Sequence, residues 1–267
     1  MKLSDKEKER LKRNYGEWAI VTGASSGIGL ELATQLADAG INLIINARND
    51  DRLLSVESGL RSSSNIQVKS VIGDVSEGKV IEKIISAAQG LNIGLLVNNA
   101  GYGTSGLFVD ASLPAEINML RVNCEAVLSL THHFAQRFKQ QRRGGIIFLS
   151  SLVAFQGVPY AANYAASKAY IQSFAEALAE ELKPFNVDVL AAAPGPVQSG
   201  FGQRANMNMN NAISPDKLGV PILVALGRQT NVVPGLLSKI LIYSLRMVPR
   251  NSKVKIMKKV MGGFTGH

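Results

Sequence analysis

The sequence predicts an α/β protein: one domain built on a doubly wound parallel sheet, with helices on both faces. From residue 18 onward, short apolar runs alternate with longer segments of helical periodicity, which is the pattern of consecutive βαβ units. The apolar runs are rich in Ile, Val and Leu and lack polar alternation, as expected for strands that are buried on both faces. A chain of 267 residues with no internal repeat or long linker is typical of a single α/β domain.

Six apolar runs are the expected strands, and five helical patterns fill most of the intervals between them. The strands are expected at residues 18–23, 41–47, 66–72, 93–99, 145–150 and 187–193. The helices are expected at residues 27–39, 50–60, 76–89, 114–141 and 161–183. After residue 200 the pattern loosens into a polar, Asn-rich stretch that leaves from the carboxyl end of a strand. Ligands bind at such ends in open α/β sheets, so this stretch is either a mobile flap over a site or a plain surface loop.

The net charge of +9 is concentrated at the C-terminal end of the chain. The nine basic residues from Lys217 onward meet no acidic residue, whereas the preceding part carries equal numbers of basic and acidic side chains. Within the apolar segment 234–249, Lys239 and Arg246 are seven residues apart, which places both on one stripe of an amphipathic helix. We expect this helix to pack on the protein itself, to cover a dimer partner or to lie in a membrane interface. Nucleic acid is not expected, because aromatic side chains are scarce among the basic ones.

A glycine-rich turn, TGASSGIG, follows the first expected strand and leads directly into a helix. Glycine lets the backbone turn tightly and approach a pyrophosphate, which the free amides of the helix N-terminus then bind. The position of the turn in the first βαβ unit makes a dinucleotide site the expected function of this segment. The candidate cofactor-binding residues are Gly23, Ser25, Ser26, Gly27, Ile28 and Gly29.

The end of the second expected strand predicts NADP(H) as the cofactor. Ala47 and Arg48 stand where an NAD site would carry an acidic residue for the ribose hydroxyls, and a planar guanidinium suits the 2′-phosphate of NADP. The other interpretation of Arg48 is an exposed arginine in a loop. Five further residues follow later strands, where they either line an adenine and ribose groove or simply make turns. They are Asp74, Val75, Asn99, Ala100 and Gly101.

Tyr164 and Lys168 are four residues apart in an expected helix, so both side chains project from one face. A free phenol has a pKa of about 10 and is a poor base at neutral pH. A neighbouring ammonium favours the phenolate, so we expect Lys168 to lower the pKa of Tyr164. The pair predicts proton transfer to or from a substrate.

Five motifs occur in the order found in the short-chain dehydrogenase/reductase family: TGASSGIG, NNAG, a Ser thirteen residues before Tyr164, YAASK and PGPV. The resemblance covers about residues 16 to 200 and implies a single Rossmann-like domain with a sheet of about seven strands. It implies the catalytic set Asn123, Ser151, Tyr164 and Lys168. It also implies that Pro194, Gly195, Val197 and Ser199 contact the nicotinamide carboxamide, with Ser199 where many members carry Thr.

The resemblance implies a role for each catalytic residue. Tyr164 would protonate the carbonyl oxygen while Ser151 holds that oxygen by a hydrogen bond. Lys168 would hold the ribose of the nicotinamide, and Asn123 would anchor a water in the proton relay. Ser150 is the alternative to Ser151 as the catalytic serine, because only one of two adjacent side chains at a strand end can face the cofactor.

We therefore expect an NADP(H)-dependent oxidoreductase that moves a hydride between the nicotinamide and a carbonyl or alcohol carbon, with a lipophilic ketone as substrate. The alternatives are a catalytically silent NADPH-binding protein and a membrane-associated regulatory protein on the same fold. We expect a cytoplasmic homodimer or homotetramer with no metal site, either free or peripheral to a membrane. The expected organisation is a charged leader at 1–15, a catalytic domain at 16–233, and an amphipathic helix with a basic tail at 234–267. The leader is expected to be either a solvated helix or a frayed segment.

Overall fold

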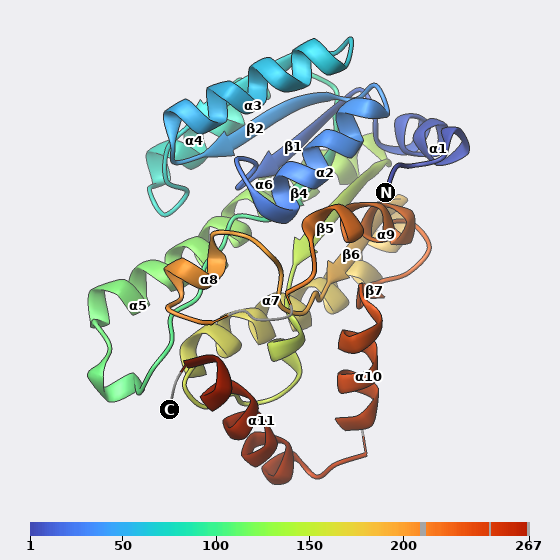
Figure 1. Cartoon of the computed structure of the whole chain (residues 1–267). Helices are drawn as coiled ribbons and strands as arrows, with labels where there is room; N and C mark the ends of the chain where they lie inside the picture. Colours follow the sequence, from blue (N-terminus) through green and yellow to red (C-terminus); the bar gives the residue numbers. More distant parts are fainter. Residues whose placement is uncertain (209–211, 246, 266–267) are drawn as a thin grey trace.

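The computed structural model describes residues 1–208, 212–245 and 247–265. Its centre is a parallel sheet of seven strands in the order β3-β2-β1-β4-β5-β6-β7 (Figure 1). The strand order reverses between β1 and β4, and in doubly wound sheets ligands bind at this position, beyond the carboxyl ends of the strands. The strands are β1 (Trp18–Thr22), β2 (Asn42–Ala47), β3 (Val68–Ile72), β4 (Ile93–Asn98), β5 (Gly144–Leu149), β6 (Val187–Ala192) and β7 (Asn231–Val232).

Two hydrophobic cores cover the two faces of the sheet, because successive residues of a strand point to opposite sides. In β1, Trp18 and Ile20 belong to one core, and Ala19 and Val21 belong to the other. The first core is closed by α4 (Gly78–Ala87), α5 (Leu113–Leu120), α6 (Ala126–Gln141) and α7 (Ala162–Leu182). The second core is closed by α1 (Asp5–Tyr15), α2 (Gly27–Asp38), α3 (Asp50–Ser63) and α9 (Gly219–Ala225). The predicted doubly wound α/β fold is confirmed.

The predicted strands and helices are present with small differences at their ends. One predicted helix, 114–141, is divided into α5 and α6 by a π-helical turn over Arg121–Glu125. Such turns are common at functional sites, and this one contains Asn123. The seventh strand spans only Asn231–Val232, too short to give a recognisable apolar run in the sequence.

The charged leader is part of the folded domain. It forms α1, in which the Ser4 side chain accepts a hydrogen bond from the amide of Glu7 and caps the helix. Leu11 and Tyr15 are buried, and the Tyr15 hydroxyl donates a hydrogen bond of 2.7 Å to Asp188. Burial is the main cause that raises the pKa of Tyr15, so the hydroxyl stays protonated. Of the two expectations for the leader, a helix is found, but this helix is not fully solvated, because one face of α1 is packed on the sheet.

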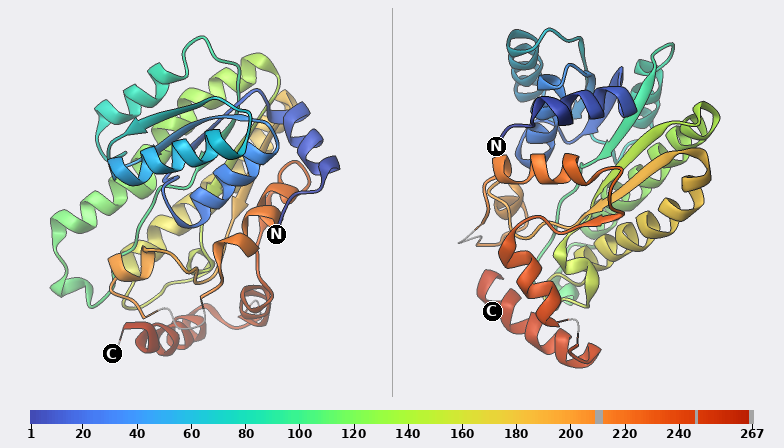
Figure 2. Two further views of the ribbon diagram at one scale, coloured as in Figure 1. Left: turned by 45° about the horizontal axis from the view of Figure 1, so that its top comes forward. Right: turned by 90° about the vertical axis from the view of Figure 1, so that its right-hand side faces the viewer.

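The C-terminal segment forms two helices beside the carboxyl ends of the strands (Figure 2). They are α10 (Leu236–Leu245), which packs on the 3-10 turn Leu152–Phe155 after β5, and α11 (Arg250–Thr265). Met257 and Met261 of α11 are buried in the first core, so the expected basic tail is a packed helix. Arg246 of the predicted stripe and residues 209–211 of the Asn-rich stretch lie outside the described residues. In the described ranges, no helix combines the length and the hydropathy needed to cross a membrane.

Candidate active site

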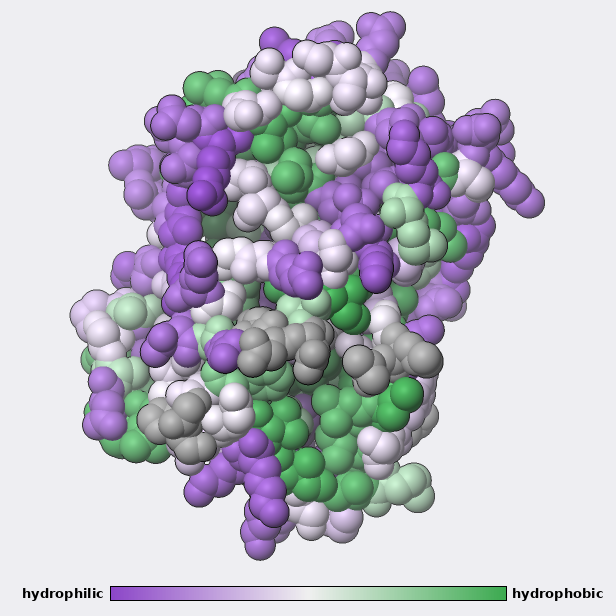
Figure 3. All heavy atoms as spheres, in the orientation of Figure 1, coloured by the Kyte–Doolittle hydropathy of each residue, from purple (hydrophilic) through white to green (hydrophobic). Residues whose placement is uncertain are grey.

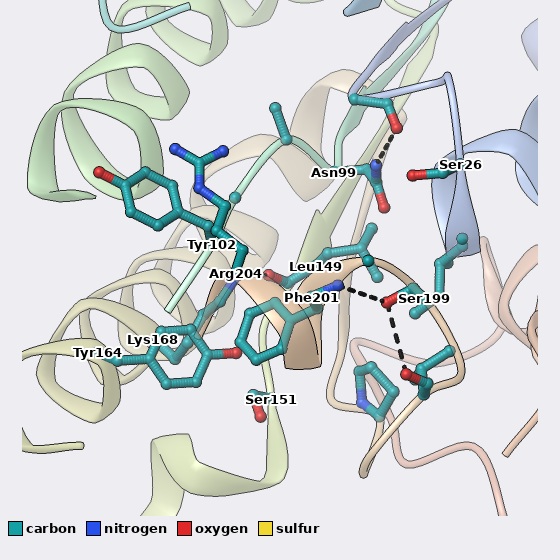
Figure 4. A pocket seen from close by; sticks show the side chains of 18 of the residues that line it. Ser26, Asn99, Tyr102, Leu149, Ser151, Tyr164, Lys168, Ser199, Phe201 and Arg204 are labelled. Carbon is teal, nitrogen blue, oxygen red and sulfur yellow. Dashed lines mark hydrogen bonds between the residues drawn. The ribbon is translucent and has the colours of Figure 1, made fainter. Parts of the chain in front are cut away.

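A large cavity of about 1070 Å³ lies at the carboxyl ends of the strands. The predicted cofactor residues and the Tyr164 and Lys168 pair meet there, and Figure 4 labels ten of the lining residues. Gly29 is the one predicted cofactor residue that lies behind the wall. The predicted residues that line the cavity are Gly23, Ser25, Ser26, Gly27, Ile28, Arg48, Asp74, Val75, Asn99, Ala100, Gly101, Ser151, Tyr164, Lys168, Pro194, Gly195, Val197 and Ser199.

The glycine-rich turn presents the N-terminus of α2 to the cavity. Gly23 and Gly27 have φ of +66° and +60°, a backbone region that side chains with a Cβ rarely adopt. The Ser26 side chain caps none of the first amides of α2 among the described residues, so these amides are available to an anion. A Cβ on Gly29 would overlap the side-chain amide nitrogen of Asn99, so glycine is needed there for close packing. The turn fits the pyrophosphate of a dinucleotide.

The NNAG segment braces this turn. The Asn99 side-chain amide donates hydrogen bonds to the carbonyl oxygens of Thr22 and Gly23, at 2.9 and 3.0 Å. The backbone amide of Ala100 donates to the Thr22 hydroxyl at 3.0 Å. The segment therefore fixes the shape of the glycine-rich turn in addition to lining the cavity, a role that was not predicted from the sequence.

Arg48 lies at the mouth of the cavity, at the end of β2. Its guanidinium is 3.6 Å from the carboxylate of Asp74, and its side chain is 53% exposed. Asp74 is in turn held by the backbone amide of Ser76, which donates to it at 3.0 Å. A guanidinium that is oriented by one carboxylate and still open to solvent can accept a phosphate, so the residues here fit the 2′-phosphate of NADP(H).

Tyr164, Ser151 and Lys168 meet near the middle of the cavity. Burial raises the pKa of Tyr164 to about 12, and a hydrogen bond from Ser151 acts in the opposite direction. Lys168 is also buried, which lowers its pKa to about 8, and its ammonium donates a 2.7 Å hydrogen bond to the Leu149 carbonyl. The Lys168 nitrogen lies 5.9 Å from the centre of the Tyr164 ring. The expectation that Lys168 lowers the pKa of Tyr164 is wrong for this structure, because desolvation outweighs the other effects on the phenol.

Ser151 and its competitor Ser150 point in different directions. Both residues line the cavity, but Ser151 acts on Tyr164 and lowers its pKa, whereas the Ser150 side chain is buried and donates to the backbone carbonyl of Lys168 at 3.3 Å. The alternation of side chains at the end of β5 therefore places Ser151 beside the phenol, as its spacing to Tyr164 predicts.

Asn123 is buried behind the cavity wall. Its side-chain amide donates to the Tyr102 carbonyl at 2.8 Å and to the Ser167 hydroxyl at 3.0 Å, and its oxygen accepts from the Tyr102 amide at 3.1 Å. These bonds use both hydrogens of the amide, and they tie the π-helical turn to the segment after β4 and to α7. Asn123 therefore positions these elements, and its expected role in anchoring a water stays a prediction.

The described part of the Asn-rich stretch after β6 lines the cavity and contributes residues that were not predicted. Its short helix α8 (Phe201–Arg204) places the Phe201 ring 5.3 Å from the Tyr164 ring, measured between centroids. The Arg204 guanidinium lies 3.5 Å above the centre of the Tyr102 ring (Figure 4). Ser105 donates a hydrogen bond to the carbonyl of Ala205, which ties the stretch to the loop after β4. The sequence left open a flap over a site or a plain surface loop, and the described part of the stretch lies over the site.

The buried Lys168 predicts a pH dependence of stability. Its pKa falls from 10.5 to about 8 on folding, so the unfolded chain binds more protons between these values and stability rises with pH across this window. The unfolding free energy of the wild type relative to Lys168→Met should therefore increase from pH 8 to pH 10, by up to about 3 kcal/mol. Urea unfolding followed by circular dichroism measures it. The control is Lys83→Met, at an exposed position. If the difference in unfolding free energy between the wild type and Lys168→Met stayed constant with pH, this would contradict the burial of a titrating Lys168.

Comparison with protein-family models matches residues 17–210 to the model described as short chain dehydrogenase. A 7beta-hydroxysteroid dehydrogenase of Clostridium sardiniense is 31% identical over 185 residues, which cover 69% of this chain and 71% of that protein. A very-long-chain 3-oxoacyl-CoA reductase of Coccidioides immitis is 35% identical over 203 residues, covering 73% of this chain and 58% of that protein.

Solved structures agree with these matches. A 7beta-hydroxysteroid dehydrogenase structure superposes with a TM-score of 0.86 at 25% identity and covers 92% of this chain and 98% of its own. A short-chain dehydrogenase from Sphingobium yanoikuyae in complex with NADPH gives a TM-score of 0.81 at 27% identity, with coverage of 91% and 95%. The similarity therefore includes the segment after residue 210 as well as the sheet.

Proposed function

The chain belongs to the short-chain dehydrogenase family, and from this membership we propose that it is an NADP(H)-dependent oxidoreductase that reduces a lipophilic ketone. Members of the family move a hydride between a nicotinamide and an alcohol or carbonyl carbon, and this chain is an enzyme of that class. The observation that carries the proposal is the joint position of Ser151, Tyr164 and Lys168 in one cavity with the glycine-rich turn. A catalytically silent protein is not favoured, because this set is complete.

The geometry of these residues supports a reduction in which Tyr164 is the acid. NADPH, when bound, supplies the hydride to the carbonyl carbon. The Ser151 and Tyr164 hydroxyls both face the cavity, so a carbonyl oxygen placed between them accepts hydrogen bonds from both. With a pKa of about 12, Tyr164 carries its proton at neutral pH and can donate it to this oxygen as negative charge develops. The hydrogen bond from Ser151, which acts to lower the pKa of Tyr164, stabilises the phenolate that remains.

The proposed substrate is a bulky, lipophilic ketone because the half of the cavity beyond Tyr164 is apolar. The C-terminal helices supply part of this wall, so the segment 234–267 belongs functionally to the catalytic domain at 16–233. The names of the relatives, which refer to hydroxysteroids and very-long-chain 3-oxoacyl-CoA, support this class. The apolar residues of this wall are Leu152, Val153, Phe201, Met207, Leu241, Met257, Val260, Met261 and Phe264.

We further propose a cytoplasmic homodimer or homotetramer that contacts a membrane at its periphery. Exposed apolar side chains on α5, α6 and α7 support self-association through these helices. They are Ile117, Leu120, Leu128 and Tyr170. The basic C-terminal helices, which lie outside this group, support the membrane contact.

Titration with the two reduced cofactors tests the proposed function. The purified protein is titrated with NADPH and with NADH, and nicotinamide fluorescence reports the bound fraction. NADPH should bind about 10- to 100-fold more tightly than NADH, because a charge-assisted contact to its extra phosphate is worth about 1.5–3 kcal/mol. Equal affinities would contradict the preference for NADP(H), and binding of neither nucleotide would contradict the oxidoreductase itself.

A further inference from the structure

The outer face of α10 carries an exposed apolar stripe. Ile240, Tyr243 and Met247 follow each other at intervals of three and four residues, and they are 56%, 63% and 90% exposed. Ile240 and Tyr243, three residues apart, lie on one side of α10, and Met247 comes two residues after the end of the helix. Ile256, which is 38% exposed, adds an apolar side chain on α11. Large apolar side chains grouped in this way mark a contact surface rather than an ordinary solvated face.

Basic side chains surround the stripe, and the sequence offers them no acidic partner after Asp216. On α11, Lys255 and Lys259 are one turn apart and lie on the same face as Ile256. The exposed basic residues of the two helices are Lys239, Arg250, Lys255, Lys258 and Lys259. Among the described residues these cations form no ion pair with an acidic side chain, and a surface that combines them with an apolar stripe is complementary to an anionic lipid headgroup layer.

The inner faces of the same helices form part of the wall of the cavity. Leu241 of α10 and Met257, Met261 and Phe264 of α11 line it, on the opposite side from the exposed stripe. The two helices therefore separate the apolar half of the cavity from the outer surface. In Figure 3 apolar side chains gather over the end of the molecule formed by these helices, with hydrophilic ones between them.

We propose that α10 and α11 dock on the surface of an anionic phospholipid membrane and bring the apolar half of the cavity next to the lipid. The side chains of Ile240, Tyr243 and Met247 enter the boundary between headgroups and acyl chains, and the lysines lie among the headgroups. A second copy of the chain is a poorer occupant, because a two-fold contact would bring the same cations face to face. Delivery of a lipophilic substrate from this membrane rests on the proposed function, whereas the docking itself does not.

Vesicle sedimentation tests the docking with the full chain. Vesicles of phosphatidylglycerol and phosphatidylcholine should sediment the wild type, vesicles of phosphatidylcholine alone should not, and added salt should weaken binding. The double variant Lys255→Glu and Lys259→Glu should lower the affinity about tenfold or more. The matched control is Lys6→Glu with Lys83→Glu, which changes the net charge equally on α1 and α4, at the other end of the molecule (Figure 1). It should bind nearly as well as the wild type.

The apolar stripe is tested separately by Ile240→Gln, with Leu54→Gln on α3 as the control of similar exposure. Ile240→Gln should weaken vesicle binding about fivefold, and Leu54→Gln should leave it unchanged. A wild type that stays in the supernatant with anionic vesicles, or equal losses in the two charge-reversed variants, would overturn the proposal. So would a change in molar mass by light scattering in Ile240→Gln without a change in vesicle binding, because the stripe would then be a contact between copies. None of these measurements needs NADPH or turnover, so their failure would leave the proposed reduction standing.

Discussion

Replacing Tyr164 by Phe is expected to lower kcat by about 10²- to 10⁴-fold while the Kd for NADPH stays nearly unchanged. The substitution removes only the hydroxyl that donates the proton, and the ring keeps its packing against Phe201. Ketone-dependent oxidation of NADPH gives kcat, and nicotinamide fluorescence gives the Kd. A loss of turnover without a loss of binding is the signature of a proton donor.

Tyr170→Phe is the matched control for this variant. It removes a phenolic hydroxyl from the same helix, α7, at a position where the ring is exposed and stacks on Phe174. Its kcat should equal that of the wild type. If Tyr164→Phe retained full turnover, the assignment of the proton donor would be wrong; if it lost NADPH binding in proportion to turnover, the residue would be structural.

Arg48→Ala is expected to raise the Kd for NADPH by about 10- to 100-fold and to leave the Kd for NADH nearly unchanged. The two cofactors differ only in the 2′-phosphate, so a loss confined to NADPH locates that phosphate at the guanidinium. The half-exposed Arg48 has little packing to lose, and the fold of the variant should be intact. The titration described for the wild type measures both constants.

Arg52→Ala gives the comparison within the same part of the cavity. Arg52 lies on α3, and it lines the cavity near Arg48. If Arg48→Ala weakened NADPH and NADH equally, or if only Arg52→Ala discriminated between them, the phosphate contact would have to be moved from Arg48. If only Arg48→Ala lost affinity for NADPH, this would show that the residue after β2 selects the cofactor.

The fold was largely predictable because its signals are local. The Ile- and Val-rich runs became strands, since a strand buried on both faces needs an uninterrupted apolar sequence. The glycine-rich turn, Arg48 and Tyr164 line one cavity because parallel strands bring their carboxyl ends to one edge of the sheet. Spacing along α7 was enough to place Tyr164 and Lys168 on one face.

What the sequence did not predict depends on tertiary contacts. Burial sets the direction in which the pKa of Tyr164 shifts, and the spacing along a helix does not reveal burial. Only the family resemblance identified Asn123, and only the folded chain shows its side chain held by Tyr102 and Ser167. Phe201 and Arg204 lie in an irregular stretch that the sequence offered as a flap over a site, but without periodicity it did not indicate which side chains line the cavity.

Transfer of deuterium from the nicotinamide to a product tests the central claim, hydride transfer in the cavity of Tyr164, most directly. NADPH deuterated at both C4 positions is incubated with the wild type and a panel of steroid ketones and long-chain 3-oxoacyl thioesters, and the products are analysed by mass spectrometry. We expect an alcohol that carries one deuterium on the former carbonyl carbon, and almost none from Tyr164→Phe. Tight binding of NADPH with no labelled alcohol from any ketone, or equal labelling by Tyr164→Phe, would contradict it.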